Sequence, residues 1–148
     1  MLNRQQLELF NRKSFRYPLQ IAEKDYLLAL VLQLISRSPL GEKLIFKGGT
    51  SLHHCYLKQQ RFSEDLDFSA NQQPISLEEV QEVFSDVDYL TIKKHYQSTA
   101  TLKIERLLYT GPIGFPNSLK ILMCCRMYCC PCKKSLIALL GELNFPSE

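Results

Sequence analysis

Two glycines followed by two hydroxyl residues form the first stretch of this chain that is suited to chemistry. An apolar run and a helix-compatible segment flank Gly48, Gly49, Thr50 and Ser51. Glycine lets a backbone come close to a phosphate, and the free amides and dipole of a helix start favour negative charge. We therefore predict that these residues bind nucleotide phosphates. The alternative is a strand-to-helix turn with a hydroxyl as helix cap, the commoner use of such residues.

A pair of acidic residues follows in the stretch Asp65-Leu66-Asp67-Phe68. Residues two apart in a strand share a face, so Asp65 and Asp67 point one way while Leu66 and Phe68 point into the core. Two carboxylates near a phosphate site are what a Mg²⁺ site for nucleotide chemistry requires. We predict that this pair binds Mg²⁺ and is catalytic; the alternative is the exposed polar face of an edge strand.

Two basic residues border these blocks. Lys47 could neutralise phosphate charge, although a lysine at a strand end is often only solvated. Arg61 could reach a phosphate or pair with Glu64 or Asp65. We keep both basic residues as candidates for nucleotide binding and interpret the neighbouring His53–His54 pair as surface or packing residues.

The pattern of apolar and turn residues predicts the elements that position these blocks. Amphipathic spacing favours helices, and β-branched and aromatic runs favour strands. Ser76 and Glu79 form a capping box at the start of one helix. We predict helices at 3–11, 21–36 and 77–84, and strands at 44–46, 65–68, 89–96, 101–109 and 118–122. These elements predict an α/β (α+β) domain with a mixed sheet and helices packed against it.

Bulk composition excludes some classes of protein. The chain has 148 residues, 45% hydrophobic and 22% charged, which is ordinary for one globular domain. No tract reaches the roughly 18 apolar residues that a membrane span needs, and the first residues lack the apolar core of a secretion signal. We expect a cytoplasmic protein that does not bind membranes.

The net charge of +3 conceals a change of composition along the chain. Residues 1–105 hold equal numbers of basic and acidic side chains, whereas 106–141 contain no Asp or Glu. Five of the six cysteines lie in 124–132. Zinc sites usually bring two cysteine pairs separated by a dozen or more residues, and that spacing is missing here. A module that binds zinc and nucleic acid through these cysteines therefore remains only a minor alternative for the function.

The two blocks, taken in order, resemble a known family. Phe46-Lys47-Gly48-Gly49-Thr50-Ser51-Leu52, followed by Arg61-Phe62-Ser63-Glu64-Asp65-Leu66-Asp67-Phe68, is similar to the AbiEii/AbiGii toxins of the polymerase-β-type nucleotidyltransferase superfamily. The resemblance spans roughly 21–120. It implies the minimal nucleotidyltransferase fold, with Asp65 and Asp67 as metal ligands. It also implies Mg²⁺-dependent transfer of a nucleotidyl group from an NTP to an RNA such as tRNA, a cognate antitoxin, and a role in phage defence by abortive infection.

The chain departs from this family on the last predicted strand. The resemblance implies a third acidic residue there, but Leu122 occupies its place in Leu119-Lys120-Ile121-Leu122-Met123. The family's C-terminal half is not recognisable in 123–148. We therefore divide the chain into a nucleotidyltransferase-like part, 1–122, and an atypical cysteine-rich part, 123–148. A truncation or frameshift would explain the change and predicts weak or absent catalysis. The second alternative is a non-catalytic remnant that binds only nucleotide or antitoxin.

Overall fold

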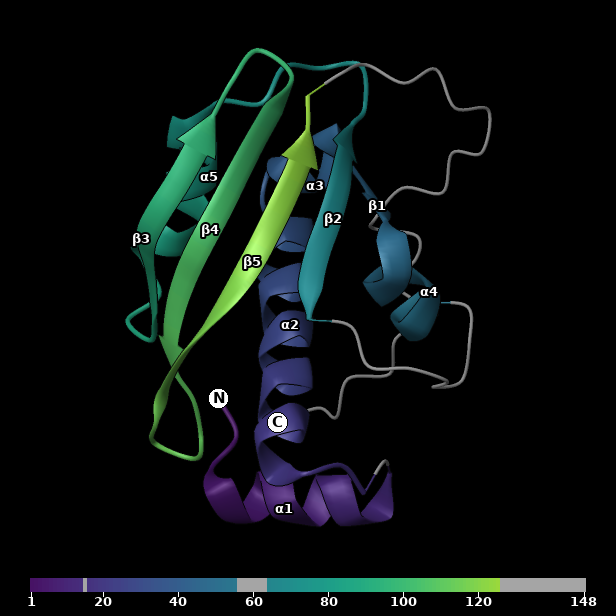
Figure 1. The fold of residues 1–148 in the computed structure, drawn as a ribbon, viewed down its shortest axis with the longest axis vertical. Helices are drawn as coiled ribbons and strands as arrows, with labels where there is room; N and C mark the ends of the chain where they lie inside the picture. The colour runs from purple at the N-terminus through teal and green to yellow at the C-terminus, as the bar shows by residue number, and fades with distance from the viewer. Residues whose placement is uncertain (15, 56–63, 126–148) are drawn as a thin grey trace.

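The fold is built on one five-stranded mixed sheet (Figure 1). The computed structural model describes residues 1–14, 16–55 and 64–125. Strand order is β1-β2-β5-β4-β3. The bounds are Leu44–Lys47 for β1, Asp65–Ala70 for β2, Leu90–Gln97 for β3, Thr101–Thr110 for β4 and Pro116–Cys124 for β5. β2 runs parallel to β5, and the other neighbouring pairs are antiparallel. The predicted mixed α/β fold is confirmed.

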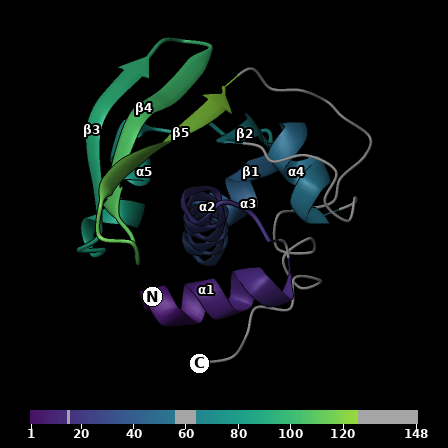
Figure 2. The ribbon, with the colours of Figure 1, turned by 60° about the horizontal axis from the view of Figure 1, so that its bottom comes forward.

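Helices lie on one side of this sheet. Their bounds are Arg4–Lys13 for α1, Leu19–Arg37 for α2, Leu40–Lys43 for α3, Gly48–Cys55 for α4 and Leu77–Ser85 for α5. Figure 2 shows the sheet curving over α2, with α1 on the far side of α2. α4 follows β1 at the edge of the sheet (Figure 1). Within the described residues, none of the helices combines the length and apolar character that crossing a bilayer demands.

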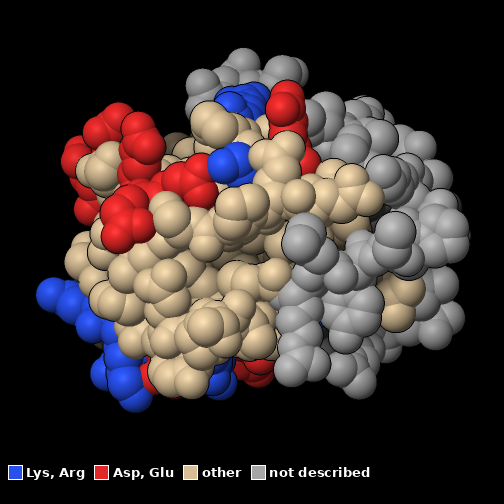
Figure 3. Space-filling view, turned by 90° about the horizontal axis from the view of Figure 1, so that it is seen from above, with Lys and Arg blue, Asp and Glu red and all other residues tan. Residues whose placement is uncertain are grey.

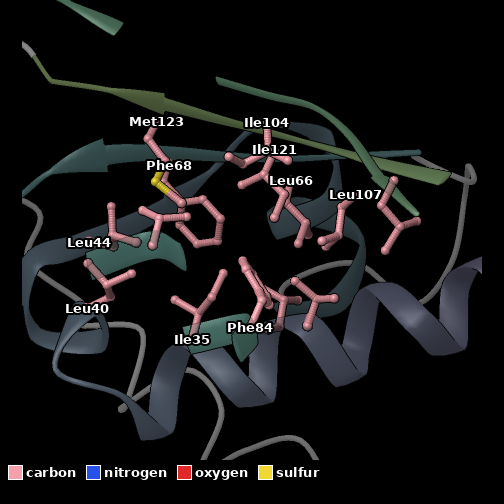
Figure 4. Packing of buried hydrophobic residues seen from close by; sticks show 14 of the residues in the cluster. Ile35, Leu40, Leu44, Leu66, Phe68, Phe84, Ile104, Leu107, Ile121 and Met123 are labelled. Carbon is pink, nitrogen blue, oxygen red and sulfur yellow. The ribbon is translucent and has the colours of Figure 1, made fainter. Parts of the chain in front are cut away.

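The core fills the space between α2 and the sheet. Leu27, Leu28, Val31, Leu32 and Ile35 of α2 are fully buried, as are Leu66, Phe68, Ile104, Leu107, Leu119, Ile121 and Met123 of the sheet. Figure 4 shows Leu66 and Phe68 pointing from the sheet toward the side of Ile35. Because the apolar residues of β2 face α2, its two aspartates must point to the side of the sheet opposite α2, which we call the open face.

The capping box of α5 is confirmed, and it also joins α5 to α3. The Ser76 hydroxyl accepts from the Glu79 amide at 3.2 Å, and the Glu79 carboxylate accepts from the Ser76 amide at 3.0 Å. The ammonium of Lys43, the last residue of α3, forms an ion pair with the same carboxylate. The hydrogen bond from Lys43, with that from Ser76, lowers the pKa of Glu79.

This lowered pKa predicts a pH-dependent loss of stability. A carboxyl with a depressed native pKa stabilises the fold above its unfolded pKa, and this contribution disappears as pH falls through the native value. Both partners are partly exposed, so we expect Glu79→Gln to cost only about 0.5 to 1 kcal/mol near neutral pH. The difference from wild type should shrink at about pH 3. Urea unfolding at both pH values measures it. Glu82→Gln on the same helix is the control, and an equal effect there would contradict the prediction.

The structure shows two features that the sequence did not predict. The single-turn helix α3 was not predicted; the Ser38 hydroxyl, which accepts from the Leu40 amide at 3.2 Å, supports its start. Glu23 lies in the second turn of α2, next to Lys24 and Asp25, yet it is only 3% exposed. Its carboxylate accepts from the Ile113 amide at 2.6 Å, which ties α2 to the β4–β5 turn. A Cβ at Gly111 would lie 2.5 Å from the same carboxylate, so this turn packs directly on Glu23.

Candidate functional site

Asp65 and Asp67 lie on the face of the sheet opposite α2. Leu66 and Phe68 are 0% exposed, whereas the two aspartates are half-buried. The neighbouring strands set what lies beside them. On β1, Lys47 is the register partner of Asp67. On β5, Lys120 pairs with Asp65 and Leu122 pairs with Asp67. The predicted alternation of β2 is confirmed, and it places both carboxylates on one surface.

The double glycine lies directly against this surface. α4 begins at Gly48, immediately after β1. Gly48 has a φ of 79°, a conformation that glycine adopts without a steric penalty. A Cβ added there would lie 2.5 Å from the Asp67 Oδ2 atom and 3.1 Å from the Asp67 Cβ. The structure therefore brings the two predicted blocks together, with the start of α4 adjoining the acidic pair.

The two hydroxyl residues of α4 face the protein. Thr50 and Ser51 are 1% and 4% exposed. The Thr50 hydroxyl donates to the backbone carbonyl of Asp65 and so ties α4 to β2. This contact gives Thr50 a positioning role. The amides of the first helical turn, by contrast, lack partners within their own helix, as at any helix start. Binding of phosphate by Thr50 and Ser51 stays a prediction.

The electrostatics of the acidic pair favour a cation. Burial raises the pKa of Asp67, the negative charge of Asp65 raises it further, and Lys47 partly offsets both effects. A divalent cation between the carboxylates would relieve this repulsion. In the described parts of the chain, no three His, Cys, Asp or Glu residues gather closely enough to hold a metal. The acidic pair fits one Mg²⁺, because this ion takes one or two carboxylates and completes its shell with water and phosphate oxygens.

An ion pair beside the acids anchors β2 to α2. The Lys24 ammonium lies 2.5 Å from the Glu64 carboxylate. Its hydrogen bond and its charge lower the pKa of Glu64, to which Lys120 adds a smaller effect. From the sequence, Arg61 was a possible partner of Glu64, and neither Lys24 nor Lys120 was expected beside this carboxylate. Lys120 could have been found from its place between two apolar residues of a predicted strand.

Several predicted residues cannot be placed in this site. Arg61, with the 56–63 segment, and the cysteines at 129, 130 and 132 lie outside the described residues. His53 and His54 belong to α4, but their side chains are not described. Leu122, predicted to stand where a third carboxylate is expected, lies directly across from Asp67 and is half-buried. The site therefore comprises Lys47, Gly48, Gly49, Asp65 and Asp67, bordered by Lys120 and Leu122 of β5.

A family described as nucleotidyl transferase AbiEii toxin, type IV TA system, matches residues 30–107. This range includes the double glycine and both aspartates. No curated protein sequence matches the chain. Two solved structures from Helicobacter pylori share the fold: JHP933, at 20% identity and a TM-score of 0.52, and a candidate nucleotidyltransferase, at 19% identity and a TM-score of 0.56.

The two matches cover different shares of the chains compared. They include 72% and 74% of this chain, but only 44% and 47% of the respective Helicobacter chains. This chain therefore spans less than half the length of either structure.

Proposed function

The chain belongs to the AbiEii family of nucleotidyltransferase toxins of type IV toxin–antitoxin systems, and from this we propose that it transfers a nucleotidyl group from an NTP to RNA. One observation carries the proposal: the Asp67 carboxylate lies against Gly48 at the start of α4. A phosphate held by the amides of α4 would therefore adjoin the acidic pair, as nucleotidyl transfer requires.

Each residue of the site has a different proposed role. Asp65 and Asp67 would hold Mg²⁺, which would supply positive charge to the nucleotide phosphates and activate the attacking hydroxyl. The amides at Gly48 and Gly49 would receive phosphate oxygens. Lys47, whose charge already acts on Asp67, would offset negative charge on the β1 side. Thr50 would hold α4 in place through its bond to the Asp65 carbonyl.

The charge distribution supports an RNA acceptor that approaches from the open face of the sheet. Figure 3 shows a patch of acidic side chains at the upper left of this view, with basic side chains beside it and at the lower left. Glu78, Glu79 and Glu82 are carried by α5, on the helical side. On the opposite face of the sheet, Lys103 of β4 alternates with the buried Leu102 and Ile104 and is the register partner of Leu122. Basic side chains attract a phosphate backbone and acidic ones repel it, so the open face suits an RNA end such as that of tRNA.

Family membership also supports a biological setting. A toxin of a toxin–antitoxin system is controlled by a cognate antitoxin, and we include such a partner in the proposal. We place the activity in the cytoplasm, where NTPs and tRNA are available, with growth arrest or abortive phage infection as its outcome. Co-expression with the neighbouring reading frames of the source genome, followed by co-purification, tests for the partner.

A labelling assay tests the reaction. The purified chain is incubated with total RNA, Mg²⁺ and each of the four NTPs in turn, labelled at the α-phosphate. We expect label to enter RNA with at least one NTP and to be lost in EDTA. Leu122 beside Asp67 favours a second candidate, a nucleotide-binding protein without transfer. Calorimetric binding of an NTP with no labelled RNA would select that candidate and reject the transferase.

A further inference from the structure

Lys120 is a charged neighbour of the acidic pair to which no role has been given so far. On β5 it lies between Leu119 and Ile121, both fully buried, and is itself exposed. The alternation of the strand therefore puts its side chain on the open face. Its register partner across the parallel pairing is Asp65. Neighbouring strands are about 4.8 Å apart, which is well within the reach of a lysine side chain.

The next outward-facing residue of β5 is apolar. Leu122 is the register partner of Asp67 on one side and of Lys103 on the other. On this face the neighbour of Asp67 on β5 is therefore a leucine. The neighbour of that leucine on β4 is Lys103, which carries a positive charge. A pair of catalytic metal ions lies about 3.5 to 4 Å apart and needs acidic ligands for both ions. On β5 the register partners of Asp65 and Asp67 are a lysine and a leucine, so they supply no acidic ligand for a second ion.

From this arrangement we infer that the site, if it acts as proposed above, binds a single divalent cation and uses the Lys120 ammonium to neutralise phosphate charge in place of a second cation. Asp65 and Asp67 hold the one ion, and Lys120 binds the triphosphate of the nucleotide from the β5 side. Together with the α4 amides and Lys47, Lys120 would enclose the phosphates between β1 and β5. The positive charge of Lys120 also repels a second cation.

Counting bound metal ions tests the first half of the inference. Mn²⁺ is titrated into the full chain and followed by electron paramagnetic resonance. We expect one tightly bound ion per wild-type chain and a second ion in Leu122→Asp. Leu122→Asn is the matched control, equal in size and polarity but without the charge, and should bind one ion. Two tight ions in wild type, or one ion in a folded Leu122→Asp chain, would overturn the inference.

Binding of inorganic tripolyphosphate in EDTA tests the second half. Charged hydrogen bonds are the strong ones, so Lys120→Met should weaken binding about tenfold, and Lys120→Arg should restore most of it. Lys13→Met, which changes an exposed lysine at the end of α1 on the other side of the molecule, should bind like wild type. Equal binding by wild type and Lys120→Met would overturn the role of Lys120.

The result that would contradict the proposed function differs from those that would contradict the inference about Lys120. If wild type binds no Mn²⁺ and no tripolyphosphate, the metal and phosphate sites themselves are wrong, and the inference about Lys120 falls with them. If wild type binds both, only the number of ions and the response of the β5 variants decide the inference.

Discussion

Asp67→Asn is expected to abolish nucleotidyl transfer while leaving the protein as stable as wild type or more stable. The change keeps the shape of the side chain and removes one of the two charges available to hold Mg²⁺. Loss of such electrostatic stabilisation at a reacting centre costs at least a factor of about 10² to 10³. In the labelling assay, incorporation into RNA should fall to background, whereas Asp88→Asn, on an exposed residue, should retain full activity.

The stability part of this prediction follows from the cost of the Asp67 charge. Burial and the charge of Asp65 both raise the pKa of Asp67. A carboxyl with a raised native pKa favours the fold at low pH and loses that contribution as pH rises through the native value. At neutral pH the ionised group is therefore unfavourable in the metal-free protein. Because Asp67 is only half-buried, solvent screens part of this cost, and the neutral amide should raise stability by at most about 0.5 to 1 kcal/mol.

Urea unfolding with and without Mg²⁺ measures both effects. Wild type should be stabilised by Mg²⁺ through mass action, and Asp67→Asn should not respond. A variant that is clearly less stable than wild type without metal would show that Asp67 has a structural role. A variant that still responds to Mg²⁺ would place the cation elsewhere.

Local chemistry explains which parts of the fold were predictable from sequence. The alternation in Asp65–Phe68 fixes a strand and its two faces, because side chains in strands have a period of two. The capping box of Ser76 and Glu79 fixes a helix start within four residues. The double glycine was recognised as a turn into a helix, and α4 begins at the first of these glycines. In each case the decisive interaction lies within a few positions of the chain.

Contacts between distant segments explain what was missed. Glu23 can be buried because its carboxylate accepts a hydrogen bond from the amide of Ile113, ninety residues later. No pattern of neighbouring residues in the sequence predicts this bond. The parallel pairing that puts Lys120 beside Asp65 joins segments more than fifty residues apart. The Thr50 hydroxyl donates to the Asp65 carbonyl, a contact that the sequence did not indicate, while phosphate binding by Thr50 stays a prediction. The sequence supplied the types of residue in the site, and the register of the sheet determined their neighbours.

Gly48→Ala is the second change for which we expect a large effect, because it strains the backbone and displaces the acidic pair together. An L-residue at a φ of 79° costs about 1 to 2 kcal/mol. In addition, the new methyl would lie 2.5 Å from the Asp67 Oδ2 atom and 3.2 Å from its Cγ. The carboxylate or the start of α4 must move, and a displacement of about 1 Å at a reacting centre can cost a hundredfold in rate.

Gly114→Ala separates the two causes. Gly114 has a similar φ of 85°, but a Cβ there meets no atom within 4 Å. Both variants should therefore lose stability in urea unfolding, whereas only Gly48→Ala should also lose labelling activity and Mn²⁺ affinity. If Gly48→Ala retained wild-type Mn²⁺ affinity, the carboxylate of Asp67 would not need the space that this glycine leaves. The close approach of α4 to the acids, on which the proposed function depends, would then have no role in binding the cation.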